Sequence, residues 1–371
     1  MQALEQRAFA EGVSAEALME EAGEKIAAAV RQFFPLPGRC LVFFGKGHNG
    51  GDALVAARHL AAAGWRIEPR PVFEAAHWSV LTKKKFAALG TTGSGGGPAV
   101  VVLDGLLGIG AGGPLREPIR GAASAINALR LDENASVFAI DLPTGLDGDL
   151  GNPGPDCVRA DFTLTIGFAK RGLVSDAATP FVGRLAILPL EELTRRAFPE
   201  EDTDTVATAR LLAPLLPPRP FDVHKGDFGR IAIVAGSRGL TGAALMASKA
   251  CVRAGAGLVS LYVTEEIHPI VAVAASPEVM VRSCASYFEL LETKPDVIAI
   301  GPGLGFGRRA EVLELIRLAR QPMIIDADAI TLLAAQPGAL DQCAGPRLLT
   351  PHPGEMARLD PGSKERSRAG T

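Results

Sequence analysis

The sequence predicts a protein of two α/β domains, each built around a parallel β-sheet. Short runs rich in β-branched residues alternate with Ala- and Leu-rich stretches of helical periodicity, which is the pattern of βαβ units. The length of 371 residues is enough for about two domains. Between the two halves, the Pro-rich string LLAPLLPPRP restricts regular structure and indicates a linker.

The first half is predicted to open with an amphipathic helix over residues 14–34. Leu18, Ile26 and Val30 recur there at the spacing of one helix face. Residues 39–44 are predicted to form a buried strand, followed by a Gly-rich loop and an Ala-rich helix over about 53–63. Further strands are predicted over residues 65–73, 99–104, 136–141, 161–166 and 183–188.

A linker is predicted over residues 191–225, and a second α/β unit follows it. Its predicted elements are strand 230–235, helix 242–254 and strands 257–263, 296–300 and 322–326. The predicted domains are therefore residues 1–205 and 206–359. A disordered tail is predicted over 360–371, because its charged and Gly/Ser residues show no apolar periodicity.

Composition argues against several classes of partner. The net charge of -3 provides no basic field for nucleic acid or an anionic membrane. Apolar stretches are broken by Gly or charge before they reach the length of a membrane span. The 5 cysteines are scattered, without a C-x-x-C pair, and the N-terminus lacks an apolar signal core. We therefore expect a cytoplasmic protein with free thiols, which binds neither nucleic acid nor membrane.

The string GKGHNGGDALVAARHL over residues 45–60 is the first candidate site. Its glycines allow close approach of a ligand and positive φ, and the amides at the following helix start favour phosphate. Taken alone, the string matches the weak G-x-G-x-x-G pattern. Glu74 then stands where a dehydrogenase would hold a ribose, which leaves an NAD-dependent dehydrogenase as an alternative. The alternative is a purely structural role, in which the string forms a tight turn and Asp52 caps the helix.

Two further Gly-rich loops follow predicted strands. VVLDGLLGIGAGGPLREP over 101–118 places Asp104 at a strand end, and AIDLPTGLDGDLG over 139–151 does the same for Asp141, with Thr144 in the turn. Each aspartate alone could simply cap a neighbouring amide. Ligands of open α/β sheets bind beyond the carboxyl ends of the strands, so three such loops together predict a shared site. Asp104 and Asp141 are the candidate proton carriers, and the sequence does not rank them.

The wider string around residues 45–60 resembles the signature of the NAD(P)H-hydrate epimerases, the N-terminal half of bifunctional repair enzymes. The resemblance implies a Rossmann-like three-layer domain that interconverts the two epimers of hydrated NADH or NADPH. It implies potassium bound by Asn49, Asp104 and Thr144. His48 stands where the family more often has Asn. The implied nucleotide contacts are His48, Asn49, Gly50, Gly51, Asp52, Gly108, Ile109, Gly110, Ala111, Gly112, Gly113, Pro114 and Asp141.

Residues 224–263, 299–305 and 348–356 resemble the ADP- or ATP-dependent NAD(P)H-hydrate dehydratases, which have a ribokinase-like fold. The resemblance implies substrate contacts at Ala243, Gly303 and His352, with ADP or ATP and magnesium as cofactor. In the family a Lys-Gly segment and a Gly-Asp loop follow the segment that matches 348–356, and neither occurs in residues 357–371. We therefore expect a partial ribokinase-like domain with absent or impaired dehydration.

Three functions remain open at this point. The first is a metabolite-repair isomerase with an attached, inactive lyase domain, and family analogy suggests a homo-oligomer. The second is the NAD-dependent dehydrogenase. The third is a non-catalytic nucleotide-binding protein on the same scaffold, because a fold alone does not establish catalysis. In the second half, Asp326 and Asp328 are predicted to cap a helix or order a loop.

Overall fold

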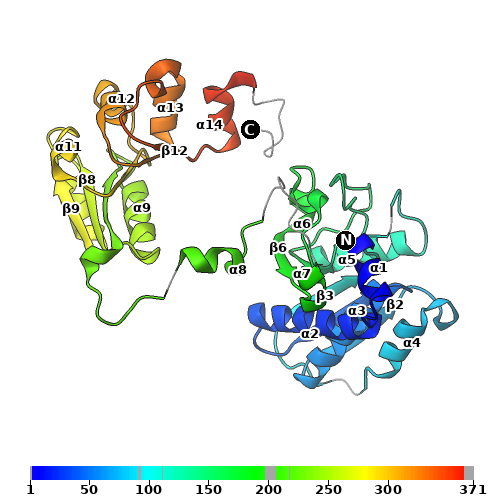
Figure 1. Ribbon diagram of the computed structural model, residues 1–371. Coiled ribbons are helices and arrows are strands. Elements are labelled where there is room, and N and C mark those ends of the chain that lie inside the picture. The colour runs from blue at the N-terminus through cyan, green and yellow to red at the C-terminus, as the bar shows by residue number, and fades with distance from the viewer. Residues whose placement is uncertain (1, 91–92, 111, 197–205, 217, 363–371) are drawn as a thin grey trace. The chain divides into compact units, whose positions relative to one another are not determined.

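The computed structural model describes residues 2–90, 93–110, 112–196, 206–216 and 218–362 (Figure 1). Contacts divide the chain into two compact units, Met1–Leu215 and Leu216–Thr371. The predicted boundary between residues 205 and 206 adjoins a stretch outside the described residues, as does most of the predicted tail. No helix in the described part of the chain is long and apolar enough to cross a membrane.

The first unit is built on a six-stranded parallel sheet with the order β2-β1-β3-β4-β5-β6. The strands are β1 (Arg39–Phe44), β2 (Arg66–Pro71), β3 (Val100–Gly105), β4 (Ser136–Ile140), β5 (Phe162–Ile166) and β6 (Arg184–Leu188). All six strands predicted from the sequence are confirmed, with ends shifted by one or two residues. Because β1 lies between β2 and β3, the strand order reverses there, and the carboxyl ends of β1 and β3 flank the switch point.

Helices cover both faces of this sheet and make three layers (Figure 1). On one face, Ile26 of α2 (Ala15–Phe33) packs in the same buried cluster as Val42 of β1. On the other face, Ile126 of α5 (Ile119–Asp132) packs in the cluster of Val102. The remaining elements are α1 (Gln2–Ala10), α3 (His48–Ala62), η1 (Ala75–His77), α4 (Val80–Ala87), η2 (Arg171–Val174), α6 (Thr179–Val182) and α7 (Glu191–Arg196).

Two predictions for the first unit are corrected by these bounds. Helix α3 begins at His48 rather than near residue 53, because Gly50 and Gly51 both fit into its tightly packed first turn. Part of the predicted linker is structured, since Glu191–Arg196 forms α7 and Ala209–Leu212 forms α8. Two ion pairs, each between a Glu and the Arg four residues later, support α7 locally.

The second unit is also built on a six-stranded parallel sheet, with the order β12-β11-β10-β7-β8-β9. The predicted strands correspond to β7 (Arg230–Val234), β8 (Leu258–Val263), β10 (Val297–Ile300) and β11 (Met323–Ile325). The edge strands β9 (Val279–Ser283) and β12 (Arg347–Leu349) were not predicted. The 3-10 helix η3 (Ala213–Leu215) follows α8 at the end of the first unit. The other elements of the second unit are η4 (Lys225–Phe228), α9 (Thr241–Arg253), α10 (His268–Ala274), α11 (Glu289–Thr293), α12 (Arg309–Leu318), α13 (Asp328–Ala334), η5 (Pro337–Leu340) and α14 (Pro353–Leu359).

Candidate active site

A cavity of about 450 Å³ opens at the carboxyl ends of the central strands of the first unit. It lies at the switch point, where ligands of open α/β sheets bind. Its wall is formed by residues from α1, α2 and the start of α3, by the end of β5, and by residues that follow β1, β2, β3, β4 and β6. The lining residues are Glu5, Phe9, Ala15, Leu18, Met19, Ala22, Lys46, Gly47, His48, Asn49, Asp52, Phe73, Leu106, Leu107, Gly108, Ile109, Gly110, Asp141, Ile166 and Leu190.

The cavity brings together most of the site predicted for the first domain. The predicted residues that line it are His48, Asn49, Asp52, Gly108, Ile109, Gly110 and Asp141. Five others do not line it: Gly50 and Gly51 are buried in the helix start, while Gly112, Gly113 and Pro114 are exposed. Ala111 lies outside the described residues. Glu74, the residue that favoured a dehydrogenase, is exposed and does not line this cavity.

The start of α3 is shaped by close packing rather than by unusual backbone angles. A Cβ on Gly50 would lie 2.3 Å from the carbonyl oxygen of Gly45, so only glycine fits there. A Cβ on Gly51 would lie 2.5 Å from the Met19 side chain of α2. The close approach predicted for this string is thus present, but Gly45, Gly50 and Gly51 are not among the positive-φ glycines. Asp52 lies inside the helix and caps nothing.

Asp104 is fully buried behind the cavity wall and does not line the cavity. Its Oδ2 accepts a hydrogen bond from the Thr144 amide at 2.9 Å, and its Oδ1 accepts from the Thr144 hydroxyl at 2.7 Å and the Leu106 amide at 3.3 Å. Burial raises the pKa of Asp104 to about 6, although these hydrogen bonds lower it in part. Asp104 therefore holds two loops together rather than facing a ligand.

Asn49 joins the same group through the backbone of Leu107. The Asn49 amide donates to the Leu107 carbonyl at 2.8 Å, and the Leu107 amide donates to the Thr144 hydroxyl at 3.3 Å. The three predicted potassium ligands, Asn49, Asp104 and Thr144, are therefore connected by a continuous chain of hydrogen bonds.

Asp141 follows β4 and faces the cavity. Its backbone has a φ of 68°, a left-handed value that Asp tolerates better than most residues. Its amide donates to the Leu164 carbonyl at 2.9 Å, which ties this turn to β5. The side-chain Oδ1 accepts from the Ile166 amide at 3.1 Å and pairs with the ammonium of Lys170.

Lys170 was not singled out by sequence reasoning. It follows β5 by four residues in the string GFAK, and an isolated lysine after a strand gives no signal of its own. Only the parallel pairing of β4 with β5 places it beside Asp141.

Two more carboxyl groups line the cavity. Burial raises the pKa of Asp52 well above its usual range, and the negative charges of Asp141 and Glu5 raise it further. Within the described residues no hydrogen bond or ion pair to the Asp52 carboxyl is found, so it is open toward the cavity. Burial also raises the pKa of Glu5, and Asp141 adds to that effect. Glu5 was missed because its helix α1 was not predicted.

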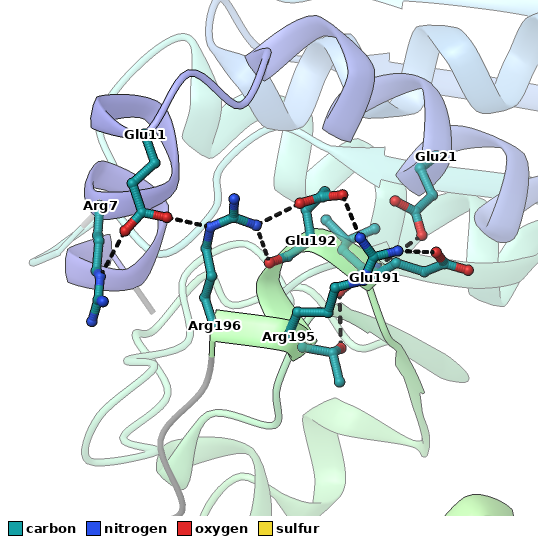
Figure 2. A network of polar contacts seen from close by, with 9 residues as sticks. Arg7, Glu11, Glu21, Glu191, Glu192, Arg195 and Arg196 are labelled. Carbon is teal, nitrogen blue, oxygen red and sulfur yellow. Dashed lines mark hydrogen bonds and ion pairs between the residues drawn. The ribbon is translucent and has the colours of Figure 1, made fainter.

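Ion pairs hold α1 against α7 and so keep Glu5 and Phe9 at the cavity. Arg196 of α7 donates to Glu11, which directly follows α1, at 2.6 Å, and Glu11 also pairs with Arg7 at 3.0 Å (Figure 2). Figure 2 shows that Arg196 is held in turn by Glu192 of its own helix. The first residues of the chain therefore close one side of the cavity.

The predicted residues of the second unit follow the carboxyl ends of β7, β10 and β12. Gly303 has a φ of 60°, and a Cβ there would lie 2.7 Å from the Cβ of Ala243, so these two residues are in contact. His352 is 63% exposed in its side chain and caps α14, where its Nδ1 accepts from the Gly354 amide at 3.0 Å. Among the described residues, the side-chain hydrogen bond and ion pair of His352 are with Gly354 and Glu355 of α14.

Asp326 and Asp328 order loops at the same edge of this sheet. Asp326 accepts from the Thr350 hydroxyl at 2.9 Å, and Asp328 accepts from the Gly305 amide at 2.9 Å. Neither caps α13, whose N-cap residue is Ala327. The loop-ordering role predicted for them is confirmed, and the capping role is wrong.

Comparison with known proteins agrees with both units. Residues 15–172 match the family model of the YjeF-related protein N-terminus, and residues 231–371 match that of NAD(P)H-hydrate dehydratase. A bifunctional NAD(P)H-hydrate repair enzyme Nnr from Gloeobacter violaceus is 38% identical over 97% of this chain and 74% of its own length. The enzyme of that name from Escherichia coli is 35% identical over 94% of this chain and 68% of its own length.

Solved structures give weaker matches. An ADP/ATP-dependent NAD(P)H-hydrate dehydratase from Bacillus subtilis, co-crystallised with ATP and Mg²⁺, is 32% identical and has a TM-score of 0.34 over 42% of this chain and 55% of its own. A yeast protein is 21% identical with a TM-score of 0.39 over 52% of this chain and 88% of its own. The two family models and the near full-length relatives carry the assignment: the chain belongs to the family of bifunctional NAD(P)H-hydrate repair enzymes.

Proposed function

We propose that the first unit interconverts the R and S epimers of hydrated NADH or NADPH in the cavity at the β1/β3 switch point. The observation that carries the proposal is the pair of carboxyl groups, Asp52 and Asp141, that face one cavity beside a helix N-terminus. Amides in the first turn of α3 suit the phosphates of a dinucleotide. The family assignment supplies the substrate class.

The chemistry needs one acid and one base. The substrate carries a hydroxyl on C6, next to the ring nitrogen. As the nitrogen lone pair forms the C6–N double bond, the C6–O bond breaks and the hydroxyl takes a proton from an acid and leaves as water. A water then adds to C6 from the opposite face and gives a proton to a base, while the electron pair returns to nitrogen. The carboxyl groups therefore exchange protons but are not consumed.

We assign the acid to Asp52 and the base to Asp141. The raised pKa of Asp52, caused first by burial, favours the protonated carboxyl that an acid needs. Asp141 is paired with the Lys170 ammonium through one oxygen and lines the cavity, which suits it to accept a proton there. The sequence did not rank Asp104 against Asp141. Asp104 is the weaker candidate, because both of its carboxyl oxygens accept hydrogen bonds from the protein and it does not line the cavity.

The residues around Asp104 suit a monovalent cation. Asp104 is fully buried, and within the described residues its contacts are neutral hydrogen-bond donors, so its negative charge has no cationic partner. Asn49 and Thr144 add neutral oxygens of the kind that hard cations prefer. We therefore propose that these three residues hold potassium, which when bound would balance the buried charge and fix the loops after β3 and β4.

An assay of separated epimers tests the function. One purified epimer of hydrated NADH is incubated with the protein and followed by chromatography, without ATP. We expect equilibration of the epimers by the wild-type chain, and a fall in kcat of between about 100-fold and 10,000-fold in both D52N and D141N. Asp132, exposed in the last turn of α5, provides the control D132N, which should match the wild type. Equal rates in D52N, D141N and D132N would contradict the assignment.

The reduced dehydration expected from the sequence stays a prediction. The same assay with ATP and magnesium tests it, because return of the S epimer to NADH would be seen as a new chromatographic peak. Appearance of that peak would overturn the expectation of impaired dehydration without affecting the proposal for the first unit.

A further inference from the structure

The Lys170 ammonium makes three polar contacts, one with Asp141 and two with the end of β5. Its Nζ donates to the Thr165 hydroxyl at 3.0 Å and to the Ile166 carbonyl at 2.9 Å, and it pairs with Oδ1 of Asp141. A lysine ammonium has three donors, and these three acceptors use all of them. The side chain is only 8% exposed, so water competes little for these bonds.

The pairing leaves the two oxygens of Asp141 in different environments. Oδ1 accepts from Lys170, from the Ile166 amide at 3.1 Å and from the Thr165 hydroxyl at 3.4 Å. Within the described residues Oδ2 accepts no hydrogen bond, although the residue lines the cavity. One oxygen is therefore fixed by the protein, and the other is free to meet a ligand.

Two acidic side chains from two helices face the same cavity as Asp141. Asp52 of α3 and Glu5 of α1 line the same cavity, and both interact electrostatically with Asp141. His48, also in the wall, interacts with Glu5. Lys170 is thus a cation in direct contact with the Asp141 carboxylate, beside a cavity that two further carboxyl groups line.

We propose that Lys170 is a positioning residue for epimerisation: its ion pair holds one oxygen of Asp141 in place and so aims the free oxygen at the substrate. The inference rests on the proposed function, because it assigns a role within that reaction. Lys170 does not line the cavity and has no donor left, so it acts through Asp141 rather than on the substrate.

The test combines kinetics with a measurement that needs no substrate. Variants K170M, K170R and D141N and the double variant K170M/D141N are assayed for epimerisation between pH 5 and 9. Lys83, an exposed lysine of α4 that bonds only the Ala76 carbonyl at 3.3 Å, provides the control K83M. For K170M we expect a fall in kcat of about 10-fold to 100-fold and an acidic limb of the pH–rate profile moved upward by about one pH unit or more. K170R should recover part of both.

The double variant separates a positioning role from a structural one. If Lys170 acts through Asp141, K170M should cost little once Asp141 is already Asn, so the two effects should be far from additive. The thermal midpoint of K170M should also rise from pH 8 to pH 5 relative to the wild type, because protonation removes an unpaired buried charge. Additive losses, or an unmoved acidic limb in both K170M and K170R, would overturn the inference. An inactive wild type would instead refute the proposed function, and the pH dependence of the midpoint would still test the ion pair.

Discussion

The substitution D104N tests how much the buried carboxylate behind the cavity costs the fold. The pKa of Asp104 is raised by burial from 3.8 to about 6. Between these values the folded protein keeps a proton that the unfolded chain has lost, so stability must fall as pH rises through this window. A difference of about two units between the folded and unfolded pKa corresponds to about 3 kcal/mol in the free energy of unfolding, at about 1.4 kcal/mol for each unit.

The informative quantity is the difference in the free energy of unfolding between wild type and D104N. Asn loses one acceptor and faces the amide of Thr144 with a donor, which costs about 1–3 kcal/mol at every pH. Because this cost does not change with pH, it cancels when the difference at pH 4 is compared with that at pH 7. We expect the stability of the wild type relative to D104N to fall by about 2.4 kcal/mol over that range in sodium buffer, because a small part of the full value is already lost at pH 4.

The first unit provides its own probe for this measurement. The sequence has 2 tryptophans, Trp65 and Trp78, and both lie buried in that unit. Urea unfolding followed by tryptophan fluorescence therefore reports the first unit in the intact chain. Replacing sodium with potassium should reduce the loss in the wild type and leave D104N unchanged, because the cation would balance a charge that Asn lacks. A flat difference across pH 4–7, or equal potassium effects in both proteins, would refute the reasoning.

Two further pairs of variants test the walls of the cavity. G50A should destabilise the first unit by several kcal/mol, because the new Cβ would meet the immobile Gly45 carbonyl. G51A should cost about 1 kcal/mol or less, since the Met19 side chain can move and Ala favours a helix. Urea unfolding compares the two variants, and equal losses of stability would contradict this reasoning. R196M should raise KM several-fold and speed amide hydrogen exchange in α1, because it removes the ion pair that holds α1 at the cavity. The free energy of unfolding should fall by less than about 1 kcal/mol. The neighbouring R195M, which affects pairs within α7 only, should do neither, and identical behaviour of the two would argue against a role for α1.

The strands could be predicted from the sequence because a buried parallel sheet requires continuous apolar runs. The predicted strand at 39–44 is fully confirmed by β1, in which five of the six residues are buried. The edge strand β9 carries exposed residues in its second half, and β12 has only three residues, so neither gives such a run. The start of α3 was misplaced because glycines usually break helices, whereas Gly50 is retained there by its contact with Gly45.

The candidate site could be predicted only in part. Loops at strand ends are visible in the sequence, so Asp52 and Asp141 were found. Glu5 reaches the cavity, and Lys170 reaches Asp141, through contacts between segments far apart in the chain, and no local pattern marks either residue. Glu5 depends on the ion pair between Glu11 and Arg196, which are separated by 185 positions. Tertiary packing, rather than any motif, completes the charged wall.

The ranking of the two strand-end aspartates shows where the sequence pattern stops being informative. Asp104 pairs in register with Ala139, and Asp141 lies two residues beyond it. Simple alternation along a strand would therefore place Asp104 and Asp141 on the same side of the sheet. The left-handed φ of 68° at Asp141 ends that alternation and turns its side chain to the cavity. Asn tolerates such a φ, whereas Ala does not, so D141N removes the charge without adding backbone strain. A loss of activity in D141N is then evidence about proton transfer, while the same loss in D141A would mix chemistry with a distorted turn.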